Sequence, residues 1–185
     1  MKRPALLAVG LAALGASTAG MARAETPVVQ PTRDVDVTYK VPVAGGAGVS
    51  ILQRLRFSAS LRRQRVDLPT SGNWMVLDFA SRRMAMVRDE SHEIVDLAAP
   101  DSATQPGTVN AFTRVGPGQV AGLDCTEWRT LDTRGQQTIA CYTQDGVLLR
   151  ARNENTVLME AVGVKFAPQG PDVFKLPDGY SRQTP

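Results

Sequence analysis

The feature that most constrains the fold of this chain is an alternation of apolar and polar side chains with a period of two residues. In residues 34–41 the apolar positions are Val35, Val37, Tyr39 and Val41. Side chains of a β-strand point alternately to its two faces, so this spacing predicts a strand that buries one face. Similar segments recur at short spacing along the rest of the chain, and they predict a mainly β protein.

The number and spacing of these segments predict a curved antiparallel sheet of about 8–10 strands, either closed into a barrel or left open as a half-barrel. A β-sandwich of two sheets would give the same alternation, and the periodicity does not distinguish the two folds. One or two short helices are expected. Ile94, Leu97 and Ala98 have helical spacing and predict a helix over residues 89–98, and one helical turn is expected at residues 172–176.

One predicted strand carries a stripe of arginines. The alternation of residues 51–61 reverses its phase after Arg62 and Arg63, which predicts a β-bulge or bend at that point. Before the reversal, Arg54 and Arg56 share the polar face with Arg62. This stripe would suit an anionic head group or an acidic partner, although the solvated face of an amphipathic strand has the same pattern.

Residues 1–24 have the three parts of an export signal. Lys2 and Arg3 form the positive start, residues 5–16 are apolar, and Ala22-Arg23-Ala24 is the small-x-small pattern that signal peptidase needs. We expect cleavage after Ala24 and a periplasmic mature protein. The apolar run is about a dozen residues long, whereas a membrane-spanning helix needs about 20, so we expect no transmembrane span in the mature chain.

The rest of the chain is expected to form one domain. Residues 25–33 are interpreted as a flexible leader, residues 34–180 as a single β-rich domain, and residues 181–185 as a C-terminal tail. Cleavage removes three of the 21 Lys and Arg residues, which leaves 18 basic against 18 acidic side chains. A chain without net charge lacks the basic field that nucleic acids attract, so we expect no nucleic-acid partner.

The composition argues against most catalytic chemistry. One His and two Cys are too few for a zinc, haem or iron–sulfur centre, so no metal and no cofactor is expected. His92 lies beside Ser91 and among acidic residues, which leaves a hydrolase acting through His92 as an alternative. The sequence has no G-x-S-x-G nucleophile motif, and adjacent side chains point in different directions. We therefore expect no catalytic residues and no enzymatic activity.

Cys125 and Cys141 are predicted to form a disulfide. An exported protein meets oxidising conditions, in which two cysteines pair. Their midpoint is residue 133, inside the turn-like residues 132–135, so a hairpin there would bring the two sulfurs together. Closing a loop of about 15 residues would stabilise the fold by about 3 kcal/mol. A redox pair is the alternative, but such pairs usually have C-x-x-C spacing.

The candidate ligand-binding side chains lie in two predicted hairpins. Four methionines follow the export signal, and three of them fall in residues 74–87. A turn about residues 81–82 would place Phe79 opposite Met84, and Leu77 opposite Met86. Methionine suits a surface that repacks around apolar ligands, although an ordinary core would show the same pattern. The candidate cavity-lining residues are Met75, Leu77, Phe79, Met84 and Met86, with Leu149 and Met159 from the last hairpin.

Three segments carry a family resemblance: residues 125–128 (CTEW) with the later Cys141, residues 145–150 (DGVLLR) and residues 174–180 (FKLPDGY). They resemble a family of exported bacterial proteins without assigned function, which is similar in turn to the outer-membrane lipoprotein carrier group. That group folds as an open, strongly curved antiparallel half-barrel with helices over its concave side. The resemblance covers mainly residues 112–180.

The resemblance implies a function in binding. Relatives of this kind bind acyl chains or lipids in the half-barrel, which implies a lipid or acyl-chain ligand for a similar hydrophobic cavity here. The alternative is a structural or interaction module of the cell envelope, with a filled core and a protein partner that meets the arginine stripe or a sheet edge.

Overall fold

The computed structural model of this chain describes residues 26–43, 45–46, 48–69, 72–99, 109–131, 135–154 and 156–184, with residues 109–111 described as backbone alone. The export signal expected at residues 1–24, with its cleavage point, lies outside the described residues. Within the described ranges, no helix is both long and apolar enough to cross a membrane.

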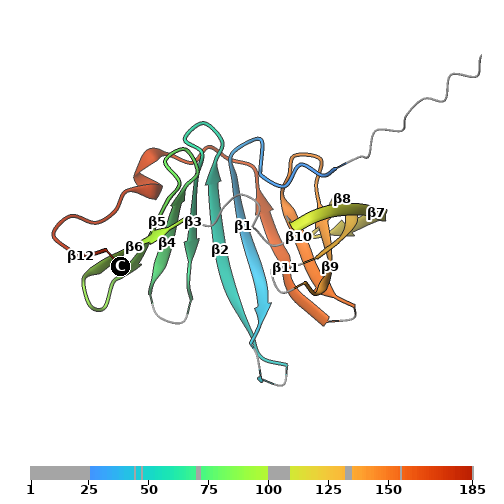
Figure 1. Cartoon of the computed structure of the whole chain (residues 1–185), viewed down its shortest axis with the longest axis horizontal. Coiled ribbons are helices and arrows are strands. Elements are labelled where there is room, and N and C mark those ends of the chain that lie inside the picture. The colour runs from blue at the N-terminus through green and yellow to red at the C-terminus, as the bar shows by residue number, and fades with distance from the viewer. Residues whose placement is uncertain are drawn as a thin grey trace, which may run out of the picture.

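The described chain forms one sheet of twelve strands (Figure 1). In chain order they are β1 (Val35–Pro42), β2 (Ser50–Ser58), β3 (Arg63–Asp67), β4 (Trp74–Asp78), β5 (Arg83–Arg88), β6 (Glu93–Ala98), β7 (Val109–Val120), β8 (Leu123–Leu131), β9 (Gln137–Tyr142), β10 (Leu148–Asn153), β11 (Thr156–Lys165) and β12 (Ser181–Gln183). Their order across the sheet is β12-β6-β5-β4-β3-β2-β1-β11-β10-β9-β8-β7. The sheet is curved and unclosed, so the predicted half-barrel is confirmed, and the alternative of a two-sheet sandwich is wrong.

The sheet has more strands than the eight to ten expected because β3, β6 and β12 were not predicted as separate strands. Three of the tight connections in the sheet carry no glycine. Loops of four residues join β2 to β3, β4 to β5 and β5 to β6. The last residues of these loops are Arg62, Arg82 and His92, with φ of 51°, 54° and 52°. A residue in this left-handed region closes many short hairpin loops, but the usual sequence signal for it is Gly or Asn.

The phase reversal at Arg62 and Arg63 is one of these loops; of the two predicted alternatives the β-bulge is wrong, and the bend is a complete reversal of the chain. Ser58 pairs with Arg63 across the loop, so β2 and β3 are two antiparallel strands. Each strand keeps its own alternation, and the four-residue connection between them shifts the phase. A bulge within one strand and a turn between two strands give the same reversal in the sequence.

The register of the β4–β5 hairpin also differs from the prediction, since Met84 pairs with Leu77 and not with Phe79. The carboxylate of Asp78 accepts hydrogen bonds of 3.0 and 2.9 Å from the backbone amides of Ala80 and Ser81. This Asx-type turn starts the loop one residue earlier than predicted. The pairing shifts by two residues, and every side chain keeps the face that the alternation gave it.

Strand pairing places side chains in rows across the sheet. One row consists of Val37, Leu55, Val66, Met75 and Met86, from β1, β2, β3, β4 and β5 in turn. We call the face that carries this row the inner face, and the opposite face the outer face. Because successive residues of a strand alternate between faces, the residues next to these in the chain belong to the outer face.

Residues 89–98, predicted to form a helix, form a turn followed by β6. Every residue of β6 pairs with β5, and β12 pairs with its other edge. Ile94 is buried on the outer face, while Val95 and Leu97 continue the inner-face rows of Met86 and Met84. Apolar residues at these positions fit a strand covered on both faces as well as a helix, and pairing with two neighbouring strands selects the strand.

The C-terminal segment, residues 166–183, crosses the outer face (Figure 1). It contains the short 3-10 helix η2 (Pro171–Phe174), where a helical turn was expected at residues 172–176. Residues 181–183, interpreted from the sequence as tail, form β12 and pair in parallel with β6. On the outer face Phe174 is 3% exposed and packs in a cluster with Trp74, Val76, Ala85, Val87 and Ile94.

The predicted disulfide joins Cys125 of β8 to Cys141 of β9, with 5.5 Å between their Cα atoms. Glu127 is the direct cross-strand partner of Cys141, so the two cysteines are diagonal neighbours. Both are buried in a core cluster with Val37 and Leu149. Burial in the core favours the structural role over the redox pair, because reactive cysteines occupy partly exposed and electropositive sites.

Candidate ligand-binding cavity

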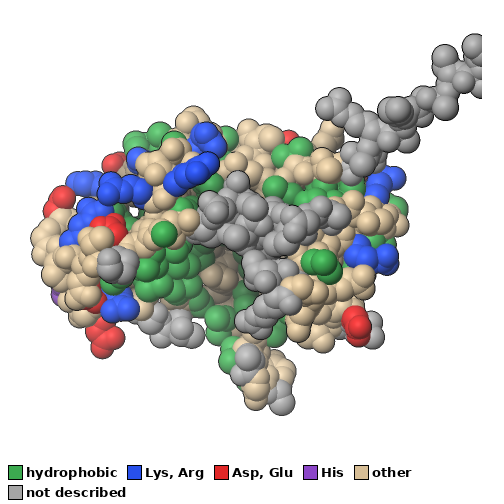
Figure 2. Space-filling view, in the orientation of Figure 1, with side chains coloured by type: hydrophobic (Ala, Val, Ile, Leu, Met, Phe, Trp, Pro, Cys, Tyr) green, Lys and Arg blue, Asp and Glu red, His purple; other side chains and the backbone are tan. Residues whose placement is uncertain are grey.

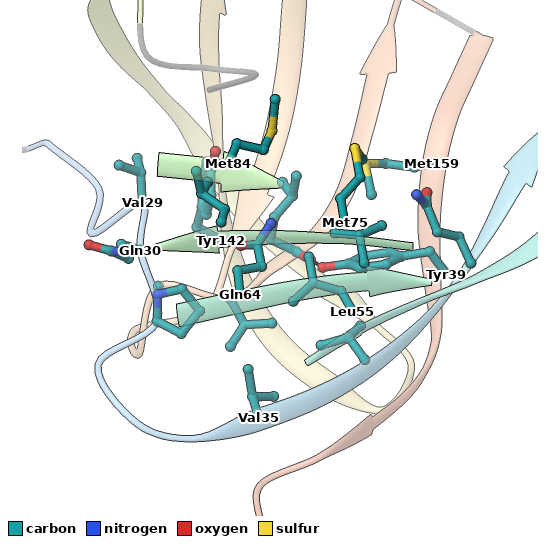
Figure 3. Close-up of a pocket in the computed structure, with 18 residues that line it drawn as sticks. Val29, Gln30, Val35, Tyr39, Leu55, Gln64, Met75, Met84, Tyr142 and Met159 are labelled. Carbon is teal, nitrogen blue, oxygen red and sulfur yellow. Dashed lines mark hydrogen bonds between the residues drawn. The ribbon is translucent and has the colours of Figure 1, made fainter. Parts of the chain in front are cut away.

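The inner face carries a cavity of about 340 Å³ (Figure 3). Strands β1–β5 supply one wall, and the rest of the lining comes from residues 29–31 of the N-terminal segment, from residues 146–148, and from Tyr142 and Met159. In the space-filling view, apolar side chains gather around the hollow and charged side chains lie mainly toward the edges (Figure 2). The apolar lining residues of the sheet are Val35, Val37, Leu55, Val66, Met75, Leu77, Met84, Leu148 and Met159.

Four of the seven candidate lining residues reach this cavity: Met75, Leu77, Met84 and Met159. The first three are brought together by the β4–β5 hairpin, in which Leu77 and Met84 are direct cross-strand partners. Met159 comes from β11, across the sheet beyond β1. The curvature of the sheet therefore joins side chains from hairpins that are far apart in the sequence.

The other three candidates lie elsewhere. Met86 lies on the inner face opposite Met75 but is not part of the cavity lining. Phe79 is the first residue of the β4–β5 loop and packs edge-to-face on Phe57, with 6.1 Å between the ring centroids. Leu149 is fully buried in the core cluster that contains the disulfide.

Two tyrosines at the cavity are uncharged. The hydroxyl of Tyr39 donates a hydrogen bond of 2.7 Å to the carbonyl oxygen of Leu148. Burial raises the pKa of Tyr39 well above its ordinary value, and it raises the pKa of Tyr142 to about 12. Burial disfavours the phenolate, so both side chains are neutral at physiological pH.

Sequence reasoning missed the glutamines of the cavity. Gln53 of β2 and Gln64 of β3 both line it, and Gln64 stands in an inner-face row between Phe57 and Leu77. The signal was present, since Gln64 is two residues before Val66 and shares its parity. Recognising the loop at Arg62 would have assigned Gln64 to the inner face.

The N-terminal segment, residues 26–33, is attached to the β9–β10 connection, although the sequence suggested a flexible leader. The amide of Thr32 donates to the carbonyl oxygen of Asp145 at 2.9 Å, and the guanidinium of Arg33 pairs with the Asp145 carboxylate at 2.7 Å. Gly146 has a φ of 82° and lies so close to Gln30 that a Cβ atom would overlap the Gln30 carbonyl group. Glycine at this position lets the segment approach and form a wall of the cavity.

Replacing Gly146 with Ala is expected to displace this wall. The new methyl group would overlap the carbonyl of Gln30, and the left-handed φ is unfavourable for Ala, so the free energy of unfolding should fall by about 1–3 kcal/mol. Hydrogen exchange at the Thr32 amide should become faster. Gly163→Ala is the control, because a Cβ atom there meets nothing within 4 Å. Unchanged protection of Thr32 in the Gly146→Ala protein would contradict this role of Gly146.

The predicted arginine stripe lies away from the cavity. Arg54 and Arg56 lie on the outer face and pair with Asp36 and Asp67, whereas Arg62 ends the β2–β3 loop. Hydrogen bonds from the Arg54 guanidinium hold the pKa of Asp36 below its ordinary value. Acidic neighbours therefore balance much of the positive charge of this stripe.

His92 lies in the exposed β5–β6 loop. Its ring packs against Tyr180, with 4.9 Å between the ring centroids, and its carbonyl oxygen accepts a hydrogen bond of 2.9 Å from the amide of Ser181. The hydroxyl of Tyr180 donates to the Asp89 carboxylate at 3.2 Å. Through these contacts the β5–β6 loop attaches the C-terminal segment next to β6.

Comparison with known proteins identifies a shared fold. No family model matches the sequence, and no curated protein matches it. The crystal structure of an uncharacterized conserved protein from Thermus thermophilus matches with a TM-score of 0.60 and 14% identity, over 83% of this chain and 91% of that chain. MucB matches with a TM-score of 0.52 and 14% identity, over 83% of this chain and 60% of MucB. The half-barrel is shared with MucB.

A third match is the complex of MucA and MucB from Pseudomonas aeruginosa, with a TM-score of 0.51 and 15% identity over 78% of this chain and 56% of that chain. This chain thus spans 56–60% of the MucB chains that it matches in these two structures. The expected likeness to carrier-type half-barrels is supported for the fold, and at this identity no sequence family follows from it.

Proposed function

We propose that this chain is an exported, periplasmic binding protein that holds an acyl chain or another apolar ligand in the cavity of its half-barrel, with no chemical step of its own. The apolar cavity beneath the N-terminal segment is the observation that carries this proposal. The basic start, apolar run and small-x-small site of residues 1–24 support the location.

The size and lining of the cavity support binding over simple packing. Protein interiors are close-packed, yet this face retains a space of about 340 Å³. Known small-molecule sites measure about 300–1,000 Å³ and are mostly apolar. Met75, Met84 and Met159 are three of the side chains around it, and methionine readily changes conformation to fit different apolar ligands.

A second candidate function is the binding of an envelope protein. It is favoured by the half-barrel shared with MucB, which has been solved in complex with MucA. A single partner protein that co-purifies with this chain, and that is lost when the charge of Arg54 is reversed, would favour this candidate. The apolar cavity would then bind no ligand of its own.

Replacing Met84 with Glu is expected to abolish ligand binding. A carboxylate inside an apolar cavity must keep its water or be desolvated at a high cost, so we expect affinity for apolar ligands to fall at least about 100-fold. Binding is measured with the neutral fluorescent probe N-phenylnaphthylamine, and bound lipid is measured by extraction and mass spectrometry of protein purified from its native compartment.

The matched control is Met86→Glu. Met86 lies on the same strand and the same face as Met84, two residues away, but is not part of the cavity lining. This variant should bind the probe as the wild-type protein does. The absence of any extracted ligand from the wild-type protein, together with no probe binding, would overturn the proposed function.

A further inference from the structure

All the described residues that line the cavity are uncharged, including its five polar members. Most of the charges on the strands that form the sheet wall lie on their outer face; Arg88 of β5 has inner-face parity, but it pairs with Glu93 and is not part of the cavity lining. On the outer face Arg56 pairs with Asp67, and Arg63 pairs with Asp78. The polar lining residues are Gln30, Gln53, Gln64, Tyr39 and Tyr142.

Gln30 of the N-terminal segment has a buried side-chain Nε2 without a hydrogen-bond partner among the described residues, and on the sheet wall Gln64 is the polar residue that stands in a row of apolar neighbours. Its cross-strand neighbours in the row are Phe57 and Leu77, both apolar, and it lies near the centre of the cavity in Figure 3. Its side-chain amide has no hydrogen bond within the described part of the chain, whereas the Tyr39 hydroxyl is committed to the Leu148 carbonyl. An amide offers two donors and one acceptor, so Gln64 presents unused hydrogen-bonding groups to the cavity.

We infer that the cavity selects uncharged ligands that combine an apolar chain with one carbonyl group, as esters and amides do, and that the side-chain amide of Gln64 donates a hydrogen bond to that carbonyl oxygen. This inference rests on the proposed function, because it specifies the ligand of the same cavity. It also gives Gln64 a partner in the bound state, which removes the cost of a half-buried amide in an apolar row.

The charge distribution opposes an ionised ligand. A carboxylate that enters the cavity loses water and meets no cationic side chain among the described lining residues. Burying an unpaired charge in an apolar site is far more costly than burying a neutral ester or amide. The anion of a fatty acid should therefore bind much more weakly than its own methyl ester.

The test compares four probes with the same hydrocarbon chain: decane, methyl decanoate, N-methyl decanamide and decanoate. Each competes with N-phenylnaphthylamine for the full mature chain at neutral pH. The ester and the amide should bind about tenfold more tightly than the hydrocarbon, because each gains one hydrogen bond to Gln64. Decanoate should bind at least about 100-fold more weakly than the ester.

The variant Gln64→Met removes the amide and keeps the length of the side chain. It should reduce ester and amide affinity about tenfold, to that of decane, and leave decane affinity unchanged. Gln183→Met on the exposed edge strand β12 is the control for the substitution itself. A second variant, Gln64→Asn, keeps an amide that is one methylene shorter, and it should lie between the wild-type protein and Gln64→Met.

The outcomes separate the two proposals. If no probe binds, the proposed function is wrong and the inference is overturned with it. If the probes bind but decanoate binds as tightly as the ester, or Gln64→Met leaves ester affinity unchanged, the proposed function stands and the selectivity assigned to Gln64 is wrong.

Discussion

Replacing both Cys125 and Cys141 with Ser is expected to lower the free energy of unfolding by about 3 kcal/mol. The two cysteines are separated by 16 positions, and the bond between them restricts the unfolded chain. Both side chains lie in the core cluster that includes Val37 and Leu149, and Val37 also lines the cavity. Loss of the disulfide therefore weakens the packing next to the cavity as well as the β8–β9 pairing.

Urea denaturation with and without a reducing agent measures this effect. The reducing agent should bring the wild-type protein to the midpoint of the double variant and leave the double variant unchanged. A wild-type midpoint that does not respond to full reduction, verified by counting free thiols, would show that the disulfide contributes little to stability.

Replacing Phe174 with Ala is expected to cost about 3–5 kcal/mol, the usual range for truncating a buried aromatic side chain. Phe174 is the residue of η2 that is buried against the outer face. Nearby, the guanidinium of Arg65 donates a hydrogen bond of 3.1 Å to the carbonyl oxygen of Val173, and the amide of Gln169 donates one of 2.7 Å to the Asp34 carboxylate. Without the Phe174 ring, these polar contacts and the partly buried side chains of Val173, Leu176 and Tyr180 would hold the segment before β12 less firmly.

Stability is measured by urea denaturation, and the local effect by hydrogen exchange at the Ser181 amide, which bonds the carbonyl of His92. Exchange at Ser181 should become faster in Phe174→Ala. Leu52→Ala is the control, because Leu52 is 59% exposed and its truncation should cost less than about 0.5 kcal/mol. A loss for Phe174→Ala as small as that of the control would refute the anchoring role of Phe174.

Much of the candidate site could be predicted because the side chains of a strand alternate between its two faces, so neighbouring residues alone show which side chains share a face. Met75, Leu77 and Met84 share the inner face, as their parity predicted, although the loop starts one residue earlier than expected. A register change of two residues preserves the face of every side chain. The cross-strand neighbours of these residues differ from the predicted ones. Phe79 lies in the loop and not in the strand, and it is not part of the cavity lining.

Other parts of the site depend on contacts between distant residues, which the alternation of apolar and polar residues within a segment does not predict. The N-terminal segment becomes a wall through Asp145 and Gly146, which lie more than a hundred residues along the chain. Gln64 enters the cavity because four residues without a glycine, ending at Arg62, form a hairpin loop. In neither case does the composition of the segment indicate its role.

The sequence by itself determined that the chain is mainly β, which side chains share a face of each hairpin, and that Cys125 and Cys141 pair. These follow from a two-residue period and from chain closure over a short loop, and both are local properties. The tertiary structure decided that residues 93–98 form a strand, which connections are loops, and which segments surround the cavity. The physical reason is that pairing and packing with distant strands outweigh the small differences in local preference between helix, bulge and turn.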